Sequence, residues 1–237
     1  MHNLFVNGDF FDWQTSGSPR LRWANRALAK AGFTSRLRQP GSTGFMTSVE
    51  LRINLYHLVS QVLAYHVPGD VMEVGTYIGS TATLLQWVID GEGQGQRLHV
   101  YDSFEKSWGS PNPLDELKRN IQEHCGKLPV IHQGQIEETI PSQLPDAISF
   151  INIDCGYDGP PNEHSAVMRH ILEHVYPRLS PGGICSLIDY WKPGLHDGLH
   201  NPNPGVQPAV DQFFMDKPEA VSVLFAHEMV HAYVRKL

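Results

Sequence analysis

The sequence lacks the features that mark membrane-spanning, secreted and disulfide-rich proteins. No apolar run approaches the roughly 18 residues of a membrane-spanning helix, and the N-terminus has no basic segment followed by an apolar one. Only 3 cysteines occur, Cys125, Cys155 and Cys185, and their odd number and wide spacing fit neither a disulfide framework nor a zinc site. We therefore expect a cytoplasmic protein that neither enters a membrane nor is exported.

Positive charge is also scarce. Lysine and arginine number 18 against 25 aspartates and glutamates, which leaves a formal net charge of −7 on 237 residues. This balance does not favour a protein that binds nucleic acid or anionic membranes through bulk charge. The dinucleotide fingerprint G-x-G-x-x-G, the P-loop and the nucleophile elbow are absent as well. A small molecule is therefore the expected partner, with no nucleic acid and no membrane.

Strand-like and helix-like runs alternate from residue 68 onward, which is the pattern of a parallel sheet with helices on both faces. The expected strands lie at 71–75, 97–102, 128–134, 147–154 and 183–190, followed by a C-terminal pair at 221–226 and 229–237. The expected helices between them lie at 80–90, 112–126, 162–179 and 207–216. We therefore predict an α/β domain over 67–237, Rossmann-like and doubly wound, with a mostly parallel seven-stranded sheet and a C-terminal antiparallel strand.

Residues 1–66 do not follow this alternation. Residues 1–45 are rich in aromatic and arginine side chains and include an expected helix at 20–32, while residues 47–66 predict an amphipathic helix. We expect residues 1–66 to form a helical N-terminal cap on the α/β core. Their aromatic-rich start is a candidate surface for a homo-oligomer.

Acidic residues and glycines gather where the first two expected strands end. Glu73, Gly75 and Gly79 form an E-x-G-x-x-x-G pattern, in which glycines let a ligand approach the backbone and the following helix offers free N–H groups. A carboxylate in an apolar strand is costly without a partner, so Glu73 indicates a cationic or amine-bearing ligand. The alternative is a tight turn that needs glycine for packing alone. Asp102 stands where doubly wound sheets hold ribose hydroxyls, and a turn cap is its alternative.

The fourth and fifth expected strands end in Asp154 and Asp189. Two carboxylates at neighbouring strand tips can share a divalent cation, or one can act as a base, and the alternative is that both are capping residues. A separate H-E-x-x-H match at His227–His231 has the spacing of a zinc protease, which requires a helix. The β-rich flanks predict strands instead, so we interpret this match as chance.

On these residues the chain resembles the class I S-adenosylmethionine-dependent methyltransferases, and more narrowly the macrocin O-methyltransferase (TylF-like) family. Residues 68–75 read P-G-D-V-M-E-V-G, similar to the family's P-G-D-x-x-E-x-G, and residues 101–105 read Y-D-S-F-E, similar to A-D-S-F-E-G. The segments around Gln135, Asp154 and Asp189 also resemble the family. The resemblance covers residues 47–237.

The resemblance implies S-adenosyl-L-methionine as the cofactor and a magnesium ion held by Asp154 and Asp189. The implied cofactor-binding residues are Glu73, Gly75, Thr76, Gly79, Ser80, Asp102, Ser103, Gln135 and Asp154. Two departures weaken the metal and base assignments, because Gly156 stands where the family has its base aspartate and Ile188 where it has a metal ligand. We therefore expect the magnesium site to be weak or absent, and the candidate catalytic residues are Asp154, His164, His196 and His200. Tyr157 and Asp158 are alternative substitutes for the missing groups, and the sequence does not choose among them.

The sequence and the resemblance thus predict an S-adenosylmethionine-dependent O-methyltransferase that acts on a small-molecule hydroxyl in secondary-metabolite biosynthesis. The substrate class that the resemblance implies is a glycoside. Because the acidic set is incomplete, one alternative is a methyltransferase-like protein that binds the cofactor but catalyses cyclisation or elimination. A non-catalytic binding protein is the other alternative.

Overall fold

The computed structural model describes residues 19–32, 47–92, 95–105, 110–226 and 229–237. The strands are β1 (Asp70–Val74), β2 (Leu98–Asp102), β3 (Val130–Gln133), β4 (Ile148–Ile153), β5 (Leu179–Ile188), β6 (Ser222–Ala226) and β7 (Met229–Arg235). The helices are α2 (Pro19–Lys30), α3 (Val49–Ala64), α4 (Ser80–Glu92), α5 (Pro113–His124), α6 (Ile136–Ser142), α7 (Pro161–Val175) and α8 (Val206–Phe214), with a 3-10 turn η2 (Tyr176–Arg178).

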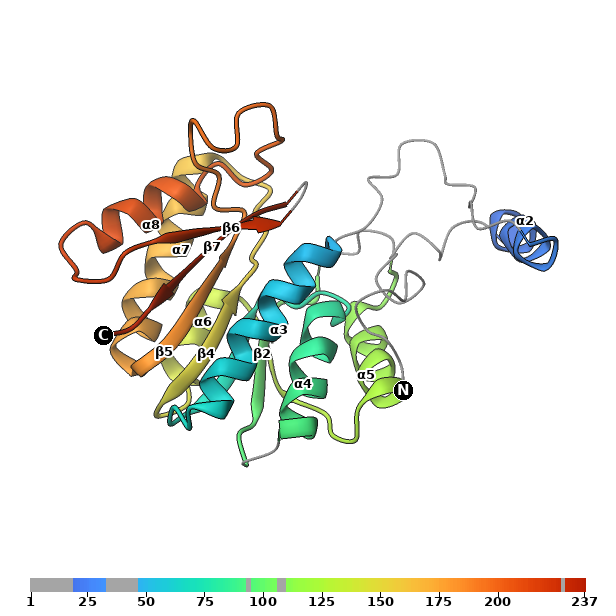
Figure 1. Ribbon diagram of the computed structural model, residues 1–237, viewed down its shortest axis with the longest axis horizontal. Coiled ribbons are helices and arrows are strands. Elements are labelled where there is room, and N and C mark those ends of the chain that lie inside the picture. The colour runs from blue at the N-terminus through green and yellow to red at the C-terminus, as the bar shows by residue number, and fades with distance from the viewer. Residues whose placement is uncertain (1–18, 33–46, 93–94, 106–109, 227–228) are drawn as a thin grey trace.

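The seven strands form one sheet in the order β3-β2-β1-β4-β5-β7-β6 (Figure 1). Strands β1 to β5 pair in parallel, and β7 runs antiparallel to both β5 and β6. This topology confirms the predicted Rossmann-like, mostly parallel sheet with an antiparallel C-terminal strand. The strands and helices predicted from residue 68 onward are all present, within a few residues of their expected ends.

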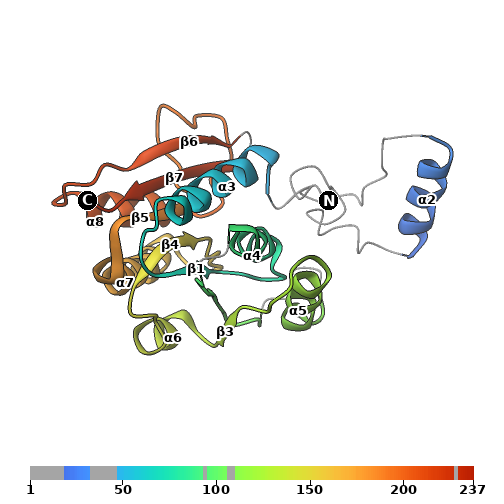
Figure 2. The same cartoon turned by 60° about the horizontal axis from the view of Figure 1, so that its bottom comes forward.

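Helices cover both faces of the sheet, and Figure 2 shows α4 and α5 across the strands from α6 and α7. Successive residues of a strand point to opposite faces, so Val71 packs in one core cluster with α3, α4 and α5, and Met72 packs in the other with α7 and α8. Because both faces are covered, central strands such as β4 are buried along their whole length.

Helix α3 belongs to one of these layers. Its apolar stripe, which includes Leu51, Leu55 and Val62, is buried, and the helix packs against α4, β5 and β6. Ser48 caps its first turn by accepting a hydrogen bond from the Leu51 N–H at 3.0 Å. The prediction that residues 1–66 cap the core stays a prediction, as does the homo-oligomer surface, because residues 1–18 and 33–46 lie outside the described ranges. No helix in those ranges has the length and apolar character to cross a bilayer.

The sequence reading missed α6, a helix of 7 residues that contains Pro141. Only Thr139 and Ile140 are buried in it, so it carries no apolar stripe with helical spacing. A short polar helix of this kind is invisible to periodicity, although it sets the position of Gln135 directly before it.

Candidate functional site

The predicted site residues meet at one edge of the sheet, where the parallel strands β1, β2, β4 and β5 all end. Open α/β sheets bind ligands outside these carboxyl ends. Backbone strain gathers at the same edge: Tyr77 after β1, Phe104 after β2 and Asp189 after β5 have φ values of 50°, 56° and 61°. Non-glycine residues adopt this left-handed conformation at a cost, and such residues cluster at functional sites.

Glu73 lies within β1 and offers one open carboxylate oxygen. Its side chain is 1% exposed, and its Oε1 accepts a hydrogen bond from Asn152 Nδ2 at 3.3 Å, whereas Oε2 is buried with no hydrogen-bond partner. Burial and then the nearby charge of Asp154 raise the pKa of Glu73 well above its usual value. A cationic or amine-bearing ligand would satisfy Oε2 and stabilise the ionised carboxylate. The residue therefore fits a cofactor that carries positive charge.

Asp102 organises the loop that follows β1. Its Oδ2 accepts hydrogen bonds from the backbone N–H groups of Thr76 and Tyr77 at 2.8 and 2.7 Å, and its Oδ1 accepts one from Phe104 at 2.7 Å. The capping role that was weighed as an alternative is therefore present. Because a carboxylate has about four lone-pair positions, Asp102 can accept one further hydrogen bond, so its contact with a ribose hydroxyl stays a prediction.

The glycines after β1 are required by packing. Gly75 has a φ of +82°, and a Cβ atom placed on it would lie 2.0 Å from the Asp154 carbonyl oxygen. Gly79 has a φ of +81°, and its Cβ would lie 3.0 Å from Leu117 Cγ on α5. The turn therefore needs both glycines to bring β1 against the end of β4 and α4 against α5. Contacts of Gly75 and Gly79 with a cofactor remain predicted.

The remaining predicted cofactor residues flank these two carboxylates. Ser80 begins α4 and is buried, as is Thr76, whose side chain acts on Glu73 and lowers the pKa of that carboxyl. At the β2 and β3 ends, Gln135 Nε2 donates to a carboxylate oxygen of Glu105 at 3.1 Å, and Ser103 Oγ accepts from the Glu105 N–H at 3.3 Å. The structure thus brings the predicted residues to one side of the same edge.

Asp154 and Asp189 form a pair of neighbouring carboxyl groups. Burial, and then the charge of Asp189, raises the pKa of Asp154, and burial also raises the pKa of Asp189. Asn203 Nδ2 donates to Asp189 Oδ2 at 2.6 Å, and the charge of His200 acts in the same direction, favouring the ionised form of Asp189. Their oxygens are the ligands that magnesium prefers, but no group of three metal-ligating His, Cys, Asp or Glu side chains occurs within the described residues. The donor set therefore fits at most a weak cation site.

The three candidate histidines differ in how far their ring nitrogens are engaged. His164 Nε2 donates to the Cys155 carbonyl oxygen at 3.0 Å, and His196 Nδ1 accepts from the Lys192 N–H at 2.9 Å. Burial lowers the pKa of both rings, so both favour the neutral form. His200 is exposed, acts electrostatically on Asp189 and makes no hydrogen bond to any residue that the structure describes. Which of the three accepts a proton stays a prediction.

Sequence reasoning missed a buried polar group beside Glu73. Asn152, Ser186 and His231 are all 0% exposed and are joined by hydrogen bonds. Asn152 and Ser186 are each flanked by apolar residues on both sides in the sequence, the same signal that singled out Glu73. His231 lies in strand β7, as the interpretation of the H-E-x-x-H match predicted, while His227 and Glu228 lie outside the described residues.

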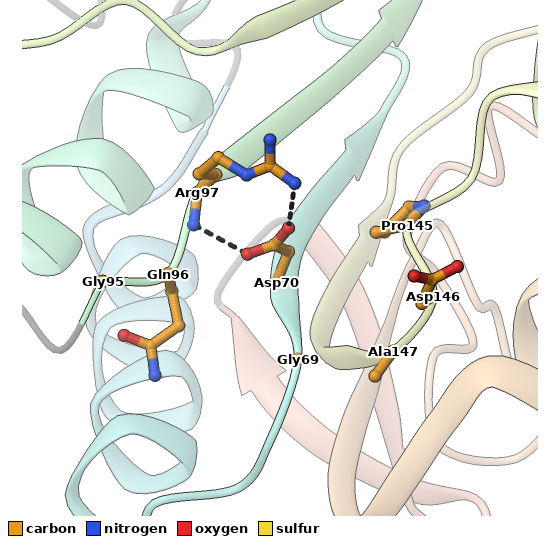
Figure 3. Close-up of a pocket in the computed structure, with 8 residues that line it drawn as sticks. All are labelled: Gly69, Asp70, Gly95, Gln96, Arg97, Pro145, Asp146 and Ala147. Atoms are coloured by element: carbon orange, nitrogen blue, oxygen red, sulfur yellow. Dashed lines mark hydrogen bonds and ion pairs between the residues drawn. The ribbon is translucent and has the colours of Figure 1, made fainter.

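A hollow of about 330 Å3 opens at the opposite edge of the sheet (Figure 3). It is lined by residues that precede or begin β1, β2 and β4, among them Asp70, Arg97 and Ala147. The Arg97 guanidinium lies 3.1 Å from Asp70 Oδ2, and the Arg97 N–H donates to Asp70 Oδ1 at 2.9 Å. The hollow is therefore separate from the strand ends that carry Glu73 and Asp154.

Comparison with known proteins adds a family match. A family model described as "Methyltransferase domain" matches residues 72–190, half of the chain. The chain is 29% identical over 178 residues to the 8-demethyl-8-(2,3-dimethoxy-alpha-L-rhamnosyl)-tetracenomycin-C 4'-O-methyltransferase of Streptomyces olivaceus, covering 68% of both proteins. It is 24% identical over 203 residues to the mycinamicin III 3''-O-methyltransferase of Micromonospora griseorubida, covering 73% of this chain and 77% of that protein.

Solved structures share the fold. The O-methyltransferase NovP superposes with a TM-score of 0.64 and 17% identity, covering 84% of both chains. The apo structure of CalS11, a TDP-rhamnose 3'-O-methyltransferase of calicheamicin biosynthesis, gives a TM-score of 0.61 and 19% identity, covering 92% of this chain and 95% of that one. At these identities the likeness establishes the architecture of the sheet and its helices.

Proposed function

The chain belongs to this family of methyltransferase domains, and on that premise we propose that it transfers a methyl group from S-adenosylmethionine to a sugar hydroxyl of a small-molecule glycoside. It is a class I S-adenosylmethionine-dependent O-methyltransferase. What remains to be assigned is the acceptor and the role of each residue at the strand ends.

The open oxygen of Glu73 is the observation that carries the cofactor assignment. S-adenosylmethionine bears an ammonium group and a sulfonium, and a buried carboxylate without a partner for one oxygen is stabilised by such a cation. We assign the ammonium group to Glu73 and the ribose hydroxyls to Asp102, whose Oδ1 has room for a further donor. Ser103 and Gln135 then lie on the adenosine side of the site.

The acceptor class is supported by the relatives. Both curated relatives are named for methyl transfer to an oxygen at a primed position of a glycosylated metabolite, and one of the names specifies a rhamnosyl group. The similar structure CalS11 is named for a nucleotide-linked rhamnose. A sugar hydroxyl is therefore the acceptor that we propose for this chain.

Methyl transfer from a sulfonium needs little activation, so positioning of the acceptor supplies much of the rate. We assign the loop after β5 to the acceptor side, because it begins at Asp189, at the same edge of the sheet as the end of β1. We assign proton removal to His200, which is exposed, since burial disfavours the protonated form of His164 and His196. Asp154 and Asp189 would orient the acceptor hydroxyl, either directly or through a weakly held magnesium ion.

The proposal is tested with the full chain, methyl-labelled S-adenosylmethionine and a panel of acceptors. The panel contains a nucleotide-linked rhamnose, a rhamnosylated aromatic polyketide and a glycosylated macrolide, each paired with the corresponding compound without its sugar. We expect label in the glycosylated members only. Label in a sugar-free compound alone would contradict the acceptor class, and cofactor binding without any transfer would favour cyclisation or elimination chemistry.

A further inference from the structure

A line of four buried polar side chains crosses the sheet from β7 to β1. His231 lies on β7, Ser186 on β5 and Asn152 on β4, each 0% exposed, and Glu73 on β1 is 1% exposed. The strand register places Asn152 directly beside both Glu73 and Ser186. The line is therefore shut off from water along its whole length and ends at the carboxylate assigned to the cofactor.

The hydrogen bonds of this line all run in one direction. Ser186 Oγ donates its only proton to Asn152 Oδ1 at 2.9 Å, so the same oxygen accepts from His231 Nε2, also at 2.9 Å. The bond to Ser186 holds the oxygen of the Asn152 amide away from β1, which turns its Nδ2 toward Glu73 Oε1 at 3.3 Å. Each donor thus points toward Glu73, an order that suits an ionised carboxylate.

Holding these groups in the core is costly. With its proton on Nε2, His231 keeps an unprotonated Nδ1 that is buried without a hydrogen-bond partner. Apolar side chains would fill the same positions in a sheet whose neighbouring residues are apolar, without that unsatisfied nitrogen. The effect of these buried polar groups is found at Glu73, where Asn152 donates to one carboxylate oxygen and the other oxygen has no hydrogen-bond partner.

We propose that His231, Ser186 and Asn152 are positioning residues that hold the Glu73 carboxylate so that its open oxygen receives the ammonium group of the cofactor. This inference rests on the proposed function, because that function assigns the ammonium group to Glu73. If these three residues only stabilised the sheet, replacing them would weaken the binding of the ammonium group no more than the binding of the rest of the cofactor.

Two ligands separate these roles in calorimetric titrations of the full chain. S-adenosylhomocysteine carries the ammonium group, and 5'-methylthioadenosine keeps the adenosine and the sulfur but lacks it. We expect Ser186→Ala to weaken S-adenosylhomocysteine binding by about 3–10-fold, the effect of losing one hydrogen bond, and to leave 5'-methylthioadenosine binding unchanged. The matched control is Ser149→Ala, a fully buried hydroxyl on β4 that donates to the Asp70 carbonyl oxygen at 3.3 Å, which should change neither affinity.

A second pair of variants tests the line at its other end. His231→Gln keeps an N–H donor for Ser186 and should bind S-adenosylhomocysteine nearly as wild type does, whereas His231→Leu removes the donor and should behave like Ser186→Ala. In a chain that already carries Glu73→Gln, Ser186→Ala should cause no further loss.

Equal weakening of both ligands by Ser186→Ala, or no weakening of either, would overturn the inference while the proposed function stood. If the wild-type chain bound neither ligand, the proposed function would fail and the inference with it. The two failures are therefore distinguishable in one set of titrations.

Discussion

Replacing Asp102 by alanine is expected to damage both the loop after β1 and the binding of the cofactor. Asp102 accepts three backbone hydrogen bonds at 2.7–2.8 Å, and two of the donors belong to Thr76 and Tyr77, which are 5% and 7% exposed. A hydrogen bond to a charged group contributes about 1.5–3 kcal/mol, and because Asp102 itself is only partly buried, water can take the place of its carboxylate for some of the three donors. We therefore expect Asp102→Ala to lower the free energy of unfolding by about 2–4 kcal/mol.

The effect of the same change on the cofactor is measured separately. Loss of a charge-assisted bond to the ribose should weaken binding by about 1–3 kcal/mol, or roughly 5–150-fold in Kd. Asp102→Asn keeps one oxygen for Thr76 and Tyr77, but it turns an NH2 group toward the Phe104 N–H and has no charge. The asparagine variant should therefore unfold at a denaturant concentration between those of wild type and Asp102→Ala.

Urea unfolding followed by circular dichroism measures the free energy of unfolding, and calorimetry on the folded variants measures the affinity for S-adenosylhomocysteine. An unfolding midpoint for Asp102→Ala equal to that of wild type would refute the supporting role derived from the three hydrogen bonds. Unchanged affinity in the folded variant would remove Asp102 from the cofactor site.

Three further predictions follow from the site. Gly75→Ala should cost more than about 3 kcal/mol of unfolding free energy, because its Cβ would meet the Asp154 carbonyl oxygen at 2.0 Å, while Gly91→Ala on α4, with nothing within 4 Å, should gain about 0.5–1 kcal/mol in the same urea titration. Burial raises the pKa of Glu73 in the folded protein, so the folded state favours the protonated carboxyl. The contribution of Glu73 to the free energy of unfolding is therefore fully present below the ordinary carboxyl pKa and is lost as pH rises through the raised pKa. Glu73→Gln should therefore flatten the fall of Tm with pH in the absence of cofactor, and an equally steep fall would show that other groups cause it. Finally, activity should drop only slightly in a chelator, because Asp154 and Asp189 supply just two carboxylates to a cation. Complete loss that magnesium restores would show that these two suffice.

The strand ends were predictable because they break a strong pattern. Glu73 stands out in an apolar strand, and Asp102, Asp154 and Asp189 each come at the end of an apolar run. The alternation of strands and helices together with these four carboxyl residues therefore locates the edge that carries the site. The parallel order of β1 to β5 brings these ends together, which the alternation of strands and helices already implied.

The contacts of these residues were not predictable. Asp102 binds the N–H groups of Thr76 and Tyr77, a pairing that depends on how the β1 and β2 ends face each other. The line from His231 to Glu73 joins residues 158 positions apart in numbering only through sheet order and register, in which β7 enters beside β5. Local patterns indicate that a strand is buried, but they do not say which strand lies next to it.

The position of β7 has a consequence for how the molecule is assembled. β7 follows every other described strand in the sequence, yet it lies inside the sheet between β5 and β6, and its Val230 carbonyl oxygen accepts the Asp189 N–H at 2.8 Å. During synthesis β6 is made before β7, which is its pairing partner in the sheet. Until β7 is made, β5 and β6 therefore each have an edge without a hydrogen-bonded neighbour. Exposed edges of this kind pair readily with other chains. A chain that stops before residue 229 would thus keep the cofactor side of the sheet, from β3 to β5, while losing the backbone support of Asp189 and presenting two unpaired strands to its neighbours.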